Sequence, residues 1–207
     1  MKAGRTYGGM TAEDRAAGRR ERLLEAGLEL FGTRGYLDTG VKDICAEAGL
    51  TDRYFYESFA DKQRLFIEIF DQVTSGLFEL VGHAVVSAGS EPEAQLRAAI
   101  GAFVEALADD NRKARLVFGE APAAGPEAER HMRTTLRQFS ALVAETARQH
   151  LPADVSESLL IVFSHSVVGT IDRVVAEWQE GELDLPVEEI TESCVALFAT
   201  ILAGIGE

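Results

Sequence analysis

The sequence predicts an all-α fold, in which a three-helix N-terminal head is followed by a larger helical body. Apolar residues recur every three or four positions along most of the 207 residues, without the alternation typical of strands. Gly or Pro interrupts this pattern at intervals of roughly one helix length. With 46% hydrophobic residues, the chain is able to bury a substantial core.

The first predicted helix covers residues 12–33. Leu24, Leu28 and Phe31 share one face of it at helical spacing. Gly35 follows at a position where a residue in the left-handed conformation commonly ends a helix. We therefore expect the helix to stop there.

A helix-turn-helix is predicted next. Thr39 is expected to cap a helix over 41–48, and Thr51 to cap a very short third helix that buries Phe55. Gly49, between the two, permits the positive φ that a tight corner needs. Two helices joined by a short glycine-containing turn have the geometry of a helix-turn-helix.

The body is expected to contain six further helices. Asp61 is placed to cap a long fourth helix, and Pro92 suits the first turn of the fifth. Asp154 and Glu157 have the spacing of a capping box. After the fourth helix, the predicted helices cover about 92–109, 111–119, 126–150, 155–180 and 187–204.

Charge is distributed unevenly between the two parts. Residues 1–64 hold 11 Lys and Arg against 11 Asp and Glu, whereas the other 143 hold 9 against 23. A neutral head is able to bind nucleic acid while an acidic body resists non-specific contacts. A merely polar N-terminal tail is the open alternative.

Cysteine usage and hydropathy indicate a cytoplasmic protein with no membrane partner. Cys45 and Cys194 lie too far apart in sequence to suggest a disulfide framework. The first ten residues lack an apolar signal segment, and the apolar run at 195–206 is too short to span a bilayer.

The stretch LTDRYFYESFADKQRL, at 50–65, mixes aromatic and charged residues in a way that suits a surface meeting a polyanion. Placing Phe55 in the core turns the following side chains outward: Thr51, Asp52, Arg53, Tyr54 and Tyr56. Hydroxyl groups donate to phosphates, and arginine binds guanine edges in a bidentate manner. Lys62 begins the fourth helix, where unpaired backbone N–H groups favour a phosphate.

This stretch resembles the end of the TetR-type DNA-binding domain, whose hallmark is Tyr-x-x-Phe-x-x-Lys-x-x-Leu. Tyr56, Phe59, Lys62 and Leu65 fill the four positions, and the resemblance extends over 22–65. It implies an N-terminal DNA-binding head that recognises a palindromic operator in double-stranded DNA.

The resemblance implies two kinds of DNA contact. Phosphate contacts are expected from Thr39, Lys42, Tyr56 and Lys62. Base contacts are expected from Thr51, Arg53 and Tyr54. For Tyr56, packing against the first helix is the alternative, and for Lys42 it is a solvated helix face.

Three positions depart from the family pattern. Gly27 stands where alanine is usual, and this weakens the first helix by about 1 kcal/mol. Ser58 replaces an aromatic residue or histidine, so no phosphate contact is assigned to it. Asp52 either accepts from a cytosine amino group or orients Arg53, and the sequence leaves both open.

No pattern indicates catalysis, a cofactor or a metal site. Nucleophile-elbow, zinc-protease, phosphate-loop and CxxC motifs are absent from the sequence, and the four histidines are scattered. His165 lies among apolar residues and is expected to be a core histidine, with a ligand contact as the alternative. We therefore expect no enzymatic activity.

The last two predicted helices are apolar around most of their circumference, more than a subunit's own core requires. Gly169 lies mid-helix and allows a close backbone approach. The resemblance implies a two-fold homodimer through these helices, and burial within a monomer is the alternative. It also implies an apolar ligand cavity in the body, for which the candidate residues are Phe70, Phe103, Phe118, Phe139 and Phe163.

These observations divide the chain into a flexible arm at 1–12, a DNA-binding domain at 13–60 and a ligand-binding and dimerisation domain at 61–207. We predict a homodimeric repressor that an apolar or amphipathic small molecule releases from its operator. The alternative is a helical ligand-binding or adaptor protein whose DNA-reading head has degenerated.

Overall fold

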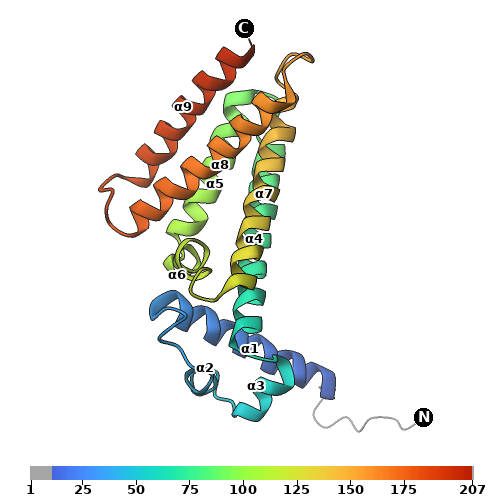
Figure 1. Cartoon of the computed structure of the whole chain (residues 1–207), viewed down its shortest axis with the longest axis vertical. Coiled ribbons are helices and arrows are strands. Elements are labelled where there is room, and N and C mark those ends of the chain that lie inside the picture. Colours follow the sequence, from blue (N-terminus) through green and yellow to red (C-terminus); the bar gives the residue numbers. More distant parts are fainter. Residues whose placement is uncertain (1–10, 207) are drawn as a thin grey trace, which may run out of the picture.

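The structure, a computed structural model, describes residues 11–206 and confirms the all-α prediction (Figure 1). The first three helices form a head at one end, and the remaining helices form the body. The elements are α1 (Ala12–Thr33), α2 (Val41–Glu47), α3 (Asp52–Ser58), α4 (Lys62–Ser87), α5 (Pro92–Ala108), α6 (Asn111–Arg115), the π-helical turn η1 (Leu116–Glu120), α7 (Pro126–Arg148), α8 (Glu157–Gln179) and α9 (Val187–Gly206). Most of the predicted N-terminal arm, including Lys2 and Arg5, lies outside the described residues.

Helix α1 is the longest helix of the head. Thr11 and Asp14 make a reciprocal capping box at its start, in which each side chain accepts a backbone N–H of the other. The helix ends at Thr33, two residues before Gly35, whose φ is +97°. Both ends of the predicted helix are therefore confirmed.

The caps of the other helices agree with the sequence only in part. Asp61 caps α4, as predicted, by accepting the N–H of Arg64 at 2.8 Å. Thr39 is not the cap of α2: Gly40 holds that position, and its N–H donates to the Asp43 carboxylate at 2.8 Å. The cap of α8 is Ser156 instead of Asp154.

Helix α4 belongs to both parts of the molecule. Leu65, Phe66 and Phe70 in its first half join the hydrophobic core of the head, which also contains Phe31 and Phe55. Its second half lies in a separate body core. The core of the head therefore continues into α4, and this helix runs without interruption from the head into the body (Figure 1).

The segment predicted as one helix at 111–119 is two elements. Helix α6 gives way at Leu116 to the wider η1 turn. Val117 and Phe118 of this turn face the interior of the body, while Glu120 contacts the head. Single π-helical turns are frequent at functional sites.

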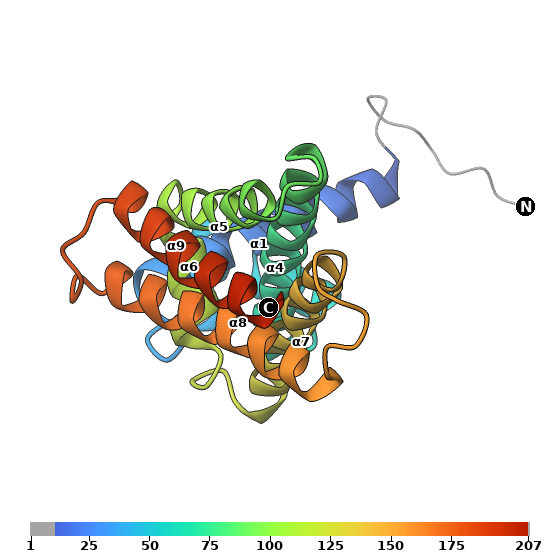
Figure 2. The same ribbon diagram turned by 90° about the horizontal axis from the view of Figure 1, so that it is seen from above.

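The long body helices form a bundle, seen from above in Figure 2. Going round the bundle, α9 packs on α5, α5 on α4, α4 on α7, and α7 on α8. Helix α8 is long and apolar enough to cross a membrane, judged by length and composition alone. Core helices of soluble proteins can meet the same criteria. Here α8 buries Leu160, Phe163, Val167 and Val175 in the body core.

The prediction that His165 is a core residue is wrong. Its side chain is exposed on the outer face of α8, where its Nδ1 lies 2.9 Å from the carbonyl oxygen of Ile161. The apolar neighbours in the sequence misled the assignment, because several of them, including Val162, are exposed on that face too.

Candidate DNA-binding surface and body cavity

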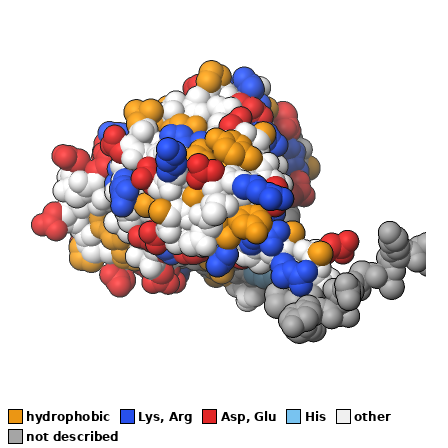
Figure 3. Space-filling view, turned by 90° about the horizontal axis from the view of Figure 1, so that it is seen from below, with side chains coloured by type: hydrophobic (Ala, Val, Ile, Leu, Met, Phe, Trp, Pro, Cys, Tyr) orange, Lys and Arg blue, Asp and Glu red, His pale blue; other side chains and the backbone are white. Residues whose placement is uncertain are grey.

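The corner between α2 and α3 presents one side of α3 to solvent. Gly49 has a φ of +62°, and Phe55 is fully buried in the core of the head. Burial of Phe55 turns the opposite side of α3 outward, as predicted. The exposed residues there are Thr51, Asp52, Arg53, Tyr56 and Glu57. Seen from the head end, Lys and Arg side chains are spread over the surface among apolar and acidic ones (Figure 3).

Arg53 is well placed to contact a base. Its side chain is 83% exposed, and it pairs with Glu57, which lies 2.9 Å away and one helical turn along α3. Such exposed pairs are worth less than about 1 kcal/mol, so the guanidinium exchanges partners easily. The pairing also shows that Glu57, and not Asp52, orients Arg53 in the free protein.

The two tyrosines of α3 have different environments. Tyr56 is 60% exposed, and its ring meets Phe55 edge-on, so its hydroxyl is available to a phosphate. Tyr54 is half-buried beneath the Arg19 guanidinium, which lies 4.5 Å from the ring centroid. Arg19, which the sequence pattern does not single out, thereby adds a positive charge beside α3.

Two of the four predicted phosphate contacts face the interior. Lys42 is exposed on α2, as expected. Thr39, however, is only 1% exposed, and its hydroxyl donates to the carbonyl oxygen of Gly35 at 2.7 Å. The side chain of Thr39 therefore fixes the turn between α1 and α2 and is not presented to DNA.

Lys62 also differs from the prediction. Its Nζ donates to the carbonyl oxygens of Tyr36 and Thr39, both at 2.7 Å, and lies 3.9 Å from the Tyr36 ring centroid. Burial lowers the pKa of this ammonium. In the free protein, Lys62 therefore joins the α1–α2 turn to the start of α4, and its charge is not free for a phosphate.

An apolar cavity of about 100 Å³ lies inside the body, between α4, α5, η1, α7 and α8. Four of the five predicted ligand residues line it: Phe70, Phe103, Phe118 and Phe139. Phe163 instead lines an adjoining cavity of about 80 Å³. The two adjoin, because Val81, Leu96, Ala99, Phe139 and Val143 line both of them.

Asp172 of α8 also lines the larger cavity and was not among the predicted ligand residues. Burial raises the pKa of its carboxyl, against a smaller opposing effect of the neighbouring Arg173. A signal is present in the run IVFSHSVVGTIDRVVAEW, where an acidic residue interrupts an apolar stretch. The same run also predicts the dimer face, and the sequence does not say which side of the helix Asp172 occupies.

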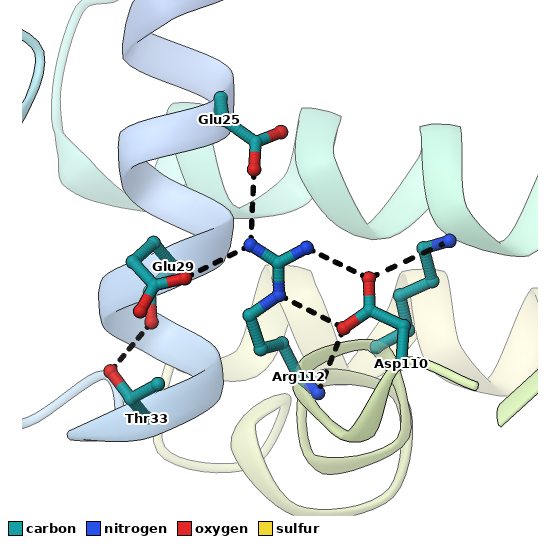
Figure 4. A network of polar contacts seen from close by, with 6 residues as sticks. Glu25, Glu29, Thr33, Asp110 and Arg112 are labelled. Atoms are coloured by element: carbon teal, nitrogen blue, oxygen red, sulfur yellow. Dashed lines mark hydrogen bonds and ion pairs between the residues drawn. The ribbon is translucent and has the colours of Figure 1, made fainter. Parts of the chain in front are cut away.

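Polar contacts connect this part of the body with the head. Arg112 of α6 donates to Glu25 and Glu29 of α1 at 3.0 and 2.9 Å, and is held in place by Asp110 (Figure 4). The hydrogen bonds to Asp110, followed by those to Glu29, raise the pKa of Arg112. The α1 and α6 residues are far apart in the sequence, and no local pattern predicts their meeting.

The η1 turn adds a second connection. Glu120 accepts the backbone N–H of Tyr36 at 2.7 Å, and Arg115 donates to the carbonyl oxygen of Thr33 at 2.5 Å. Because Phe118 lines the cavity, the same short segment contacts both the cavity and the head. No group of three His, Cys, Asp or Glu residues able to hold a metal ion occurs within 11–206.

Comparison with known proteins identifies the head. The family model described as bacterial regulatory proteins, tetR family, matches residues 23–69. The head of this chain is therefore similar to the DNA-binding domain of TetR-family regulators. This family consists of DNA-binding regulators and not of enzymes, in line with the prediction from the sequence.

Curated relatives match less than half of this chain. It is 31% identical over 100 residues to the transcriptional activator FasR of Mycolicibacterium smegmatis, covering 48% of this chain and 45% of FasR. It is 28% identical over 88 residues to the transcriptional repressor DhaR of Mycobacterium sp. strain GP1, covering 42% of this chain and 44% of DhaR. The chain thus matches less than half the length of these relatives.

Solved structures share the whole fold. The fatty acid degradation regulator FadR from Bacillus halodurans superposes with a TM-score of 0.75 at 17% identity, covering 87% of this chain and 94% of FadR. FadR from Bacillus subtilis, solved with stearoyl-CoA, superposes with a TM-score of 0.71 at 18% identity, covering 86% of this chain and 96% of that one. At these identities, the likeness shows the TetR-family fold alone.

Proposed function

We propose that this protein is a ligand-responsive transcriptional regulator of the cytoplasm, which binds a palindromic operator as a homodimer. Residues 1–12 are proposed as an arm, 13–60 as the DNA-binding domain and 61–207 as the ligand-binding and dimerisation domain. The observation that carries the proposal is the η1 turn, which lines an apolar cavity and hydrogen bonds to a TetR-family head.

The proposed effector is an apolar or amphipathic small molecule, and the proposed effect is release of a repressor from DNA. The cavity is lined almost entirely by apolar side chains, as ligand sites usually are. The stearoyl-CoA complex of Bacillus subtilis FadR supports an apolar ligand for this fold. The relatives include an activator and a repressor, so the sign of regulation needs the operator experiment.

Dimerisation is proposed through the outer faces of α8 and α9. Exposed apolar residues gather there, namely Leu159, Ile161, Val162, Leu197 and Ile201. Gly169 lies on the same face of α8, and no other atom lies within 4 Å of where its Cβ would be. Apolar surface of this kind marks interaction sites, and a two-fold pairing buries it symmetrically.

The experiment is an operator titration with the DNA upstream of the protein's own gene, with and without a ligand found by thermal stabilisation. Ligand should weaken operator affinity by a factor of about 5–150, which is the usual range of coupling. Replacing Phe70 at the cavity wall should reduce this response. Phe70 is also 1% exposed in the core of the head, so Phe70→Leu is preferable to Phe70→Ala.

Phe139→Leu is the matched control, because Phe139 lines the same cavity without joining the core of the head. A reduced response in Phe70→Leu and not in Phe139→Leu supports a route through α4. Equal ligand-induced loss of affinity in wild type and Phe70→Leu contradicts that route.

A degenerate head remains the second candidate function, because Thr39 and Lys62 turn inward. Under that alternative, the protein causes no sequence-specific electrophoretic mobility shift of the upstream DNA at any salt concentration. Under the proposed function, it does, and the binding weakens as the salt concentration rises.

A further inference from the structure

Asp172 places a carboxyl group in the otherwise largely apolar lining of the larger body cavity. The described lining of the larger cavity is apolar except for Thr74, Thr135 and Asp172. The hydroxyl of Thr74 already donates to the carbonyl oxygen of Phe70 at 2.8 Å. Asp172 therefore carries the one formal charge among these lining residues.

The carboxylate of Asp172 has no partner within the described part of the chain. No hydrogen bond or ion pair joins it to another side chain in 11–206, and burial raises its pKa. Arg173, the next residue, pairs with Glu177 at 2.6 Å with 69% of its side chain exposed, and its charge only partly offsets the effect of burial on the Asp172 pKa. An unpaired carboxylate beside apolar surface is costly, and a ligand able to pair with it removes that cost.

We propose, building on the ligand-responsive function above, that the effector is an elongated apolar molecule with a protonated amine, and that Asp172 binds the amine. The apolar part then extends from the larger cavity toward the adjoining one. An ion pair is strong in such surroundings, where the effective dielectric constant is far below that of water.

The remaining charges favour a cation over an anion. Among the described residues, no Lys or Arg lines either cavity, and His150 lines only the smaller one, so an anionic head group beside Asp172 would find no cationic partner in the larger cavity. Beyond the lining, residues 65–207 hold 9 Lys and Arg against 23 Asp and Glu. A negative body of this kind attracts cations and repels anions.

The two adjoining cavities also suggest the length of the ligand. Asp172 lines one cavity and Phe163 the other, nine residues apart on α8. At 1.5 Å per residue, they are separated by about 13 Å along the helix axis. Decylamine is comparable to this length and is a suitable probe.

The test is isothermal titration of the full-length protein with decylamine, decanol and decanoate, all below their micelle concentrations. The amine should bind roughly tenfold or more tightly than the carboxylate, a ratio equal to about 1.4 kcal/mol. In Asp172→Asn, that preference should fall to within about threefold, while decanol affinity stays the same. Glu180→Gln removes one exposed negative charge at the end of the same helix and should keep the preference of the wild type.

Three outcomes contradict the assignment. Equal affinity for amine and carboxylate in wild type overturns the cationic ligand, yet leaves an apolar effector, and so the proposed function, standing. An amine preference that survives in Asp172→Asn overturns the role of Asp172. If none of the three compounds binds, the cavity is not an apolar ligand site, and the ligand-responsive part of the proposed function fails with it.

Discussion

At the scale of single residues, the free structure separates the exposed side chains that we propose to read DNA from the side chains that hold the head together. Arg53 is exposed and weakly paired. We expect Arg53→Ala to cost about 1–3 kcal/mol of operator binding and to relax the preference at one position of each half-site. Competition titrations against operators with single base changes measure both effects. If Arg53→Ala loses the same affinity for every operator, Arg53 does not contact a base.

Lys62 and Lys42 provide a matched pair for the phosphate contacts. Because Lys62 donates to two carbonyl oxygens, Lys62→Met should lower the free energy of unfolding by about 1.5–3 kcal/mol. Lys42 is exposed, so Lys42→Met should leave stability alone and reduce the salt slope of DNA binding by about 1. Urea unfolding measures the effect on stability, and salt titrations measure the effect on DNA binding. If Lys62→Met is as stable as wild type and has a reduced salt slope of DNA binding, the phosphate contact first predicted for Lys62 is correct after all.

Asp172 predicts a pH dependence of stability. Its pKa is raised in the folded state, so the folded protein binds this proton more tightly than the unfolded chain does. Its stabilising contribution is complete below the unfolded pKa and is lost as the pH rises through the folded pKa. Asp172→Asn should therefore be more stable than wild type at neutral pH, with a difference that shrinks on acidification. Urea unfolding midpoints of both proteins, measured from acidic to neutral pH, test this prediction. A difference in stability that does not change with pH contradicts it.

At the scale of elements, α1 and α6 touch closely enough to limit what fits between them. A Cβ on Gly32 of α1 would collide with the Arg112 Cβ and lie 2.6 Å from the Arg112 Cα. Gly32→Ala should therefore push α6 away from α1 and destabilise the protein. Gly18, in the same helix, has no atom within 4 Å of such a Cβ, so Gly18→Ala should stabilise the protein by about 1 kcal/mol. Thermal unfolding of both variants tests these two predictions. If the unfolding temperature changes equally in both, the α1–α6 contact is not tight.

Elements could be predicted from the sequence where the information is local. The ends of α1, the cap at Asp61 and the first-turn Pro92 all follow from short-range rules. The π-helical η1 turn could not be predicted, since Val117 and Phe118 adopt it to meet helices distant in sequence.

The site shows the same division between local and distant information. The exposed face of α3 follows from the position of Phe55 alone. The inward turn of Lys62 depends on the carbonyl oxygens of the α1–α2 turn, more than twenty residues earlier in the chain. No spacing rule encodes that contact.

At the scale of the whole molecule, operator recognition needs two heads at a fixed separation. Successive major grooves on one face of DNA lie about 34–36 Å apart, so a single head contacts only one half-site. The proposed pairing of α8 and α9 would set this separation through α4, which is one continuous helix from the head into the body.

Gly169 provides a direct test of that arrangement. No atom lies within 4 Å of the place where a Cβ on this residue would be, so Gly169→Glu should leave the monomer fold intact. In a dimer, the new carboxylate would be buried without a partner, a change that typically costs several kcal/mol. We expect monomers by light scattering and a loss of operator affinity. Gly76→Glu is the control, because Gly76 is equally open but lies on α4, away from the proposed interface, and this variant should stay dimeric. A Gly169→Glu protein that remains dimeric and binds operator normally moves the interface away from this face of α8.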